Sequence, residues 1–71
     1  MPVVNVKWGK EKYVVEVETS VPPEVFKTQL FTLTQVLPER QKVMVMGRIL
    51  GDDSWEGITI KENMTIMMMG S

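Results

Sequence analysis

Apolar and polar side chains alternate in two short runs at the start of the chain, residues 4–8 and residues 13–18. Alternation with a period of two is typical of a strand that buries one face. Two such runs around a short polar turn that contains glycine predict a β-hairpin. In the second run, Tyr13, Val15 and Val17 fall on one side, so we expect these three side chains to face the core.

A helical pattern follows the proline pair at residues 22–23. Proline is tolerated in the first helical turn because the N–H that it lacks would have no partner there. Phe26, Leu30 and Leu33 then recur at i, i+4 and i+7, with Val25 beside them, which is the spacing of one apolar helix face. The sequence therefore predicts a helix over residues 23–34, with these three side chains buried.

Three further strands complete the predicted fold: residues 42–47, ending at a glycine turn, residues 48–50, and a methionine-rich strand within residues 63–70. An acidic loop, residues 51–57, separates the last two. With a single helix, the economical arrangement is a mixed sheet of about five strands packed on that helix, an α+β roll. We expect residues 1–71 to form one domain.

The methionine-rich strand is the most informative segment because apolar residues occupy both of its faces. If Ile66 and Met68 are buried, strand alternation leaves Met67 and Met69 in water. Contiguous apolar surface on a small domain usually marks a partner site, and the flexible, polarizable methionine side chain adapts to such a site. This pattern predicts a docking module.

Met44 is expected to join the same exposed surface. If Val43 and Val45 face the helix, Met44 faces away from it, because side chains alternate along a strand. The three methionines then share one outer face, provided that the third and the last strands are neighbours. Basic side chains around an apolar centre would attract an acidic partner. The candidates for such a rim are Lys42, Arg48, Arg40 and Lys7.

The two tryptophans have different expected roles. Trp55 lies in the acidic loop and is expected to fill the core, since large aromatic side chains carry much of the burial in a small domain. Trp8, at the tip of the predicted hairpin, has two interpretations. It either caps the edge of the core or stands beside the methionines as a binding anchor, since tryptophan is enriched among interface hot spots.

The composition narrows the classes of function. The chain has no cysteine and no histidine, and its net charge is −1. These facts exclude disulfides, thiolate nucleophiles and histidine acid–base chemistry, and they give no overall attraction to nucleic acid or to an anionic membrane. Asp52, Asp53 and Glu56 lie among glycine and serine, the composition of a solvated loop. A catalytic or RNA-contacting role for this loop or for the basic rim is the alternative from another class of function.

We therefore expect a monomeric, non-enzymatic domain with no cofactor, no nucleic-acid partner and no membrane partner. The chain shows neither the apolar segment of a signal peptide nor an apolar run near the roughly 18 residues of a membrane span. The expected location is the cytoplasm, and the nucleus as well.

Four separated blocks resemble ubiquitin and its β-grasp relatives. They are similar in particular to the N-terminal ubiquitin-like domain of the proteasome-associated ubiquitin-specific protease. The blocks are residues 6–12, 29–34, 40–45 and 68–71. The resemblance implies a β-grasp fold that docks a cysteine deubiquitinase onto a scaffold subunit in the base of the proteasome regulatory particle and supports its activation. The resemblance implies a recognised surface centred on Met44 and Met69, with Arg48 beside them and Trp8 or Gly9 at the hairpin tip. Together with the residue pattern, the predicted partner-binding residues are Met44, Met69, Met67, Trp8, Arg48, Lys42, Arg40 and Gly47.

The resemblance carries further expectations. Lys27 matches a helix lysine that is buried and paired in ubiquitin, so its role is expected to be structural. The chain lacks the two-glycine tail used in conjugation and lacks a protease domain. We therefore expect a fragment of a larger protein, whose own catalytic domain is a second candidate partner. The alternative within the same fold is the ubiquitin-like domain of a shuttle receptor or of another proteasome adaptor.

Overall fold

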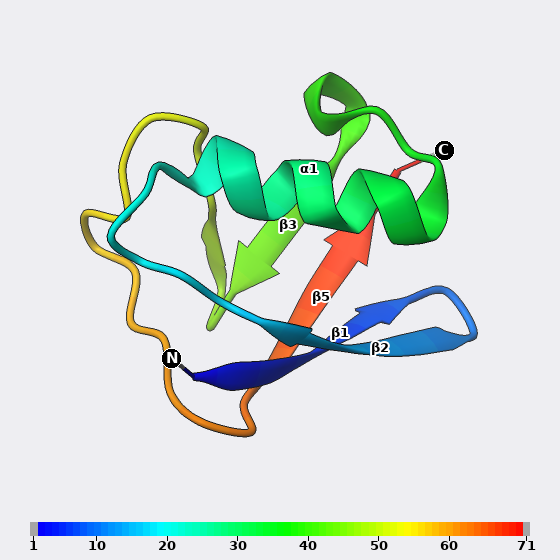
Figure 1. The fold of residues 1–71 in the computed structure, drawn as a ribbon. Coiled ribbons are helices and arrows are strands. Elements are labelled where there is room, and N and C mark those ends of the chain that lie inside the picture. Colours follow the sequence, from blue (N-terminus) through cyan, green and yellow to red (C-terminus); the bar gives the residue numbers. More distant parts are fainter. Residues whose placement is uncertain (1, 71) are drawn as a thin grey trace.

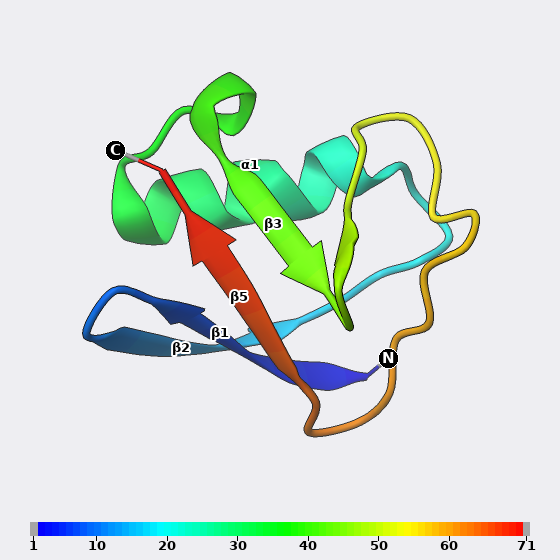
Figure 2. The same ribbon diagram turned by 180° about the vertical axis from the view of Figure 1, so that it is seen from behind.

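The computed structural model describes residues 2–70, which form a five-stranded mixed sheet packed on one α-helix (Figure 1). The strand order is β2-β1-β5-β3-β4, and the pairing is antiparallel except between β1 and β5. Figures 1 and 2 show α1 crossing one face of the sheet; within the described residues, no helix covers the other face. The elements are β1 (Val3–Trp8), β2 (Glu11–Glu16), α1 (Pro23–Thr34), the 3-10 helix η1 (Pro38–Arg40), β3 (Lys42–Val45), β4 (Arg48–Ile49) and β5 (Thr65–Met69).

Helix α1 has the predicted bounds, but its buried face is rotated from the predicted one. Phe26 and Leu30 are buried as expected, whereas the prediction for Leu33 is wrong, because 44% of its surface is exposed. The buried stripe instead continues from Leu30 to Thr34. Thr34 can be buried there because its hydroxyl donates a hydrogen bond of 2.8 Å to the carbonyl oxygen of Leu30. Lys27 is buried on the same side of the helix.

The core lies between α1 and the inner face of the sheet. The predicted inward positions of the second strand are confirmed: Val15 and Val17 are buried, and the partly buried Tyr13 packs against the core. This strand ends at Glu16, two residues earlier than predicted, yet Val17 stays in place because its N–H donates to the carbonyl oxygen of Pro2 at 2.8 Å. The buried apolar side chains are Val4, Val6, Val15, Val17, Phe26, Leu30, Val36, Val43, Val45, Leu50, Ile66 and Met68.

The loop of residues 51–57 is fastened to α1 by two side chains. The ammonium of Lys27, a residue only 5% exposed, lies 2.8 Å from Oδ1 of Asp52, as the structural role expected of this lysine requires. A buried ammonium would be costly without such a partner. Trp55 packs against Phe26, with ring centroids 6.1 Å apart, and its indole N–H donates to the carbonyl oxygen of Val21 at 2.6 Å. The prediction that Trp55 fills the core is therefore confirmed.

Within residues 2–70, the structure shows neither a metal-binding cluster of side chains nor a helix that could span a membrane. No cluster of three acidic, histidine or cysteine side chains there is placed to hold a metal ion. None of its helices has the length and apolar character needed to cross a membrane.

The rotation of α1 can be tested by comparing two leucines on the same helix. Leu30→Ala removes a fully buried side chain and should lower the free energy of unfolding by about 2–5 kcal/mol. Leu33→Ala should cost about 1 kcal/mol or less, because its side chain is already half in water. Urea unfolding followed by circular dichroism measures both values, and equal losses would contradict the assigned helix face.

Candidate functional site

One row of side chains crosses the outer face of all five strands. Its members are paired in register across each strand boundary, and paired residues on neighbouring strands point to the same side of a sheet. Alternation places this row on the side away from α1, since the residues on either side of it in β1, β3 and β5 are directed to the core. From β2 to β4 the row reads Lys12, Lys7, Met67, Met44 and Ile49.

Apolar side chains gather on the part of this face formed by β5, β3 and β4, and we call Met44, Ile49, Met67 and Met69 the Met surface. As the sequence pattern predicts, β3 and β5 are neighbours, and Met67 and Met69 are exposed while the alternate residues of β5 are buried. The exposed fractions are 59% for Ile49, 52% for Met67 and 45% for Met69. Met44 is only partly exposed, because Met67 and Ile49 flank it on both neighbouring strands.

Ile49 belongs to this surface although sequence reasoning missed it. The available signal was the two-residue turn between β3 and β4, which places Ile49 opposite Met44. Gly47 and Met46 form that turn, and both have positive φ (82° and 51°), as in the two-residue hairpins that match strand twist. Positive φ suits glycine and is uncommon for a bulky residue. Met46 nevertheless occupies this position at the hairpin tip, with 69% of its surface exposed.

The predicted basic rim divides into two groups. Lys42 is exposed opposite Met69, and Lys7 is exposed opposite Met67, so both flank the Met surface. Arg48 pairs instead with the buried Val45, and its guanidinium extends toward Gly57, where an added Cβ would lie 3.5 Å from Nη1.

Arg40 ends η1, ahead of β3, and is also exposed. Its carbonyl oxygen lies against Gly70, where an added Cβ would be only 2.5 Å from that oxygen. The structure therefore brings two of the four predicted rim residues, Lys42 and Lys7, into register with the methionines of β5.

Trp8 lies on the inner side of the sheet, away from the Met surface. Its Cα partner on β5 is the buried Met68, and its half-buried ring packs against the core. The indole N–H donates to the carbonyl oxygen of Gly70 at 3.1 Å. Of the two interpretations, the structure places Trp8 at the edge of the core, where it anchors the end of β5.

The exposure of the methionines predicts the order in which they oxidise. Dilute hydrogen peroxide should convert Met46, Met67 and Met69 to sulfoxides first. Met68 should react at least about tenfold more slowly, because it must wait for the fold to open. Peptide mass mapping over time measures these rates, and in urea the four rates should converge. Equal rates in the folded protein would contradict the inward placement of Met68.

The chain matches known proteins both in sequence and in fold. The model of the ubiquitin family matches residues 4–71. Ubiquitin carboxyl-terminal hydrolase 14 of Caenorhabditis elegans is 83% identical over 71 residues, which are all of this chain and 14% of the hydrolase. Ubiquitin carboxyl-terminal hydrolase 6 of Arabidopsis thaliana is 51% identical over 73 residues, covering 100% of this chain and 15% of that protein.

Among solved structures, the UBL domain of Plasmodium falciparum Dsk2 superimposes with a TM-score of 0.84 at 20% identity. The match covers 99% of this chain and 97% of that one. It confirms the expected β-grasp fold. The chain spans about one seventh of the curated hydrolases that it matches, and the ubiquitin family model accounts for residues 4–71 of it.

Proposed function

Because this chain is a ubiquitin-like domain and belongs to the ubiquitin family, we propose that it docks a ubiquitin carboxyl-terminal hydrolase onto the proteasome. The partner in this proposal is a scaffold subunit in the base of the regulatory particle. Docking would hold the enzyme beside arriving ubiquitinated substrates and support its activation. The observation that carries the proposal is the Met surface, an exposed apolar patch in register across β3, β4 and β5.

The similar curated proteins are hydrolases, which favours a hydrolase over a shuttle receptor as the protein to which this domain belongs. The sequence identity to hydrolase 14 is 83% over the whole chain, whereas the identity to the Dsk2 domain is 20%. The likeness to the Dsk2 domain supports a common fold alone. The hydrolase is therefore the preferred assignment.

The size of the Met surface suits a reversible interaction. Four side chains on one face of a 71-residue domain offer a small patch, and small interfaces are characteristic of transient complexes. A weak contact is sufficient for a tether, because a linked domain then acts at an effective concentration set by the linker. Lys42 and Lys7 beside the patch would raise the rate of association with an acidic surface.

The proposal predicts that Met44→Asp weakens docking without unfolding the domain. A carboxylate buried in the middle of an apolar contact should weaken binding at least about tenfold, equivalent to about 1.4 kcal/mol. Met44 is partly exposed and directed away from the core, so the free energy of unfolding should fall by only about 1 kcal/mol. Titration calorimetry with the isolated scaffold subunit measures the affinity, and circular dichroism measures the stability.

Two control variants make this test specific. Val25→Asp places the same charge at a more exposed apolar residue (46%) on α1, and should change the affinity by no more than about twofold. Val43→Asp, one residue before Met44, should unfold the domain because Val43 is fully buried. The proposal fails if the subunit binds Met44→Asp as well as it binds the unchanged domain, or if Val25→Asp weakens binding as much. Binding that survives Met44→Asp but disappears in moderate salt would instead favour a purely electrostatic partner such as RNA.

A further inference from the structure

The two outward methionines of β5 are open to oxidation in the folded protein. The chain has no cysteine, so a peroxide finds no thiol and meets thioether sulfurs instead. Met67 and Met69 are 52% and 45% exposed, whereas Met68 between them is only 2% exposed. Met64, before the strand, is partly covered, and its sulfur accepts a hydrogen bond of 3.2 Å from the N–H of Lys61. A peroxide in water therefore reaches Met67 and Met69 without any opening of the fold.

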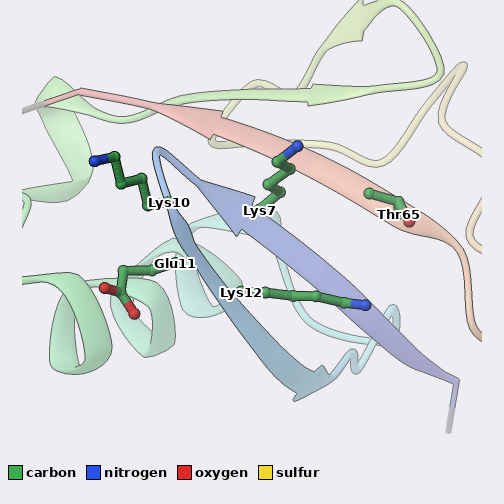
Figure 3. A pocket seen from close by; sticks show the side chains of 5 residues that line it. All are labelled: Lys7, Lys10, Glu11, Lys12 and Thr65. Atoms are coloured by element: carbon green, nitrogen blue, oxygen red, sulfur yellow. The ribbon is translucent and has the colours of Figure 1, made fainter.

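Each of these two methionines lies opposite a lysine. Lys7 on β1 is the register partner of Met67, and Lys42 on β3 is that of Met69. All four side chains are exposed, and Figure 3 shows that of Lys7 extending toward β5. Residues directly opposite on antiparallel strands have Cβ atoms about 4.5–5.5 Å apart, well within the reach of a lysine. Neither lysine takes part in an ion pair within residues 2–70, so both ammonium groups can bind an acceptor placed beside them.

Oxidation creates such an acceptor. The sulfur lone pair attacks one oxygen of hydrogen peroxide, the O–O bond breaks, and the other oxygen leaves as water with both peroxide hydrogens. The sulfur loses two electrons, the peroxide gains them, and the thioether becomes a polar sulfoxide. The S=O oxygen accepts hydrogen bonds, and a bond from an ammonium group is stronger than one from a neutral donor. An apolar contact is thus replaced by a polar group with a charged donor at hand.

We propose that Met67 and Met69 are reversible oxidation sites whose sulfoxides switch the docking surface off. Each sulfoxide oxygen accepts a hydrogen bond from its register partner, Lys7 or Lys42. One modification then makes the apolar patch polar and engages the lysines that would attract an acidic partner. The inference rests on the proposed function for the use of the Met surface. It adds a regulator of that surface, with a peroxide as oxidant and a thiol-dependent methionine sulfoxide reductase to restore the thioether.

The two faces of β5 make the switch reversible. Met67 and Met69 are exposed while their neighbours in the strand are buried, so their oxidation leaves the core in place. The melting temperature should fall by about 4 °C or less. A sulfoxide at the buried Met68 would instead place a polar oxygen in the core and unfold the domain. A sulfoxide on the surface is within reach of a reductase, which releases the oxygen as water while two thiols become a disulfide.

The test compares each protein before and after a peroxide dose that converts Met67 and Met69, as peptide mass mapping verifies. The affinity of the unchanged domain for the isolated scaffold subunit should fall at least about tenfold. Treatment with two reductases, one for each sulfoxide epimer, should restore it. The double variant Met67→Leu/Met69→Leu cannot form these sulfoxides, so peroxide should change its own starting affinity by less than about twofold.

Met46→Leu is the matched control. It removes the most exposed methionine of residues 2–70 (69%), which lies outside the Met surface. Peroxide should therefore weaken its binding as much as it weakens that of the unchanged domain.

A second readout does not need the scaffold subunit. Oxidation should shift the side-chain Cε–Hε resonances of Lys7 and Lys42, because their ammonium groups gain an acceptor. The resonance of Lys10, an exposed lysine in the turn between β1 and β2, should stay in place. The reductases should reverse both shifts.

The inference is overturned if sulfoxides at Met67 and Met69 leave the affinity unchanged, if the double variant loses as much affinity as the unchanged domain, or if the reductases do not restore binding. It is also overturned if Lys7 and Lys42 shift no more than Lys10. A scaffold subunit that binds neither the reduced nor the oxidised domain would reject the docking proposal. Reversible shifts at the two lysines would then still establish the two oxidation sites.

Discussion

The alternation of side chains along β5 is the constraint on which both the core and the Met surface depend. This strand is central in the sheet and pairs with β1 on one side and β3 on the other. A shift of one residue would turn Ile66 and Met68 outward and bury Met67 and Met69, since the side-chain period of a strand is two. The fold therefore requires the register of β5 to be fixed at both of its ends.

The structure fixes that register with a few specific contacts. Before the strand, the N–H of Asn63 donates to the carbonyl oxygen of Val3, and Met64 accepts from the N–H of Asn5, both at 2.7 Å. After it, Trp8 holds the carbonyl oxygen of Gly70, and the close approach of the Arg40 carbonyl leaves no room there for a Cβ. The inward position of Trp8 thus supports the Met surface from the other side of the sheet.

Local patterns in the sequence were sufficient for the helix bounds and for the two faces of β5, because periodicity and proline placement depend on near neighbours. They were insufficient where a distant partner decides. The buried face of α1 includes Lys27 rather than Leu33, and the partner that satisfies the Lys27 ammonium is Asp52, 25 positions away. The opposition of Lys7 and Lys12 depends on how tightly the hairpin turns: the structure turns at residues 9–10, whereas the sequence suggested residues 9–12. Ile49 was missed because its place opposite Met44 depends in the same way on the length of a turn, the one between β3 and β4.

The family assignment and the proposed docking rest on different parts of the molecule. The family assignment and the β-grasp fold rest on residues 4–71 as a whole. The proposed docking depends on a much smaller set of side chains, in which methionines lie beside lysines along one row. Because α1 covers the opposite face of the sheet, a partner can be seated on this row without disturbing the core (Figure 2).

The most direct measurement is an amide chemical-shift titration of the labelled domain with the isolated scaffold subunits of the proteasome base. The account predicts shifts at Lys7, Lys12, residues 42–49 and residues 65–70, with the exposed side of α1 unaffected. Shifts concentrated on α1, or no shifts at a high concentration of the subunits, would contradict it.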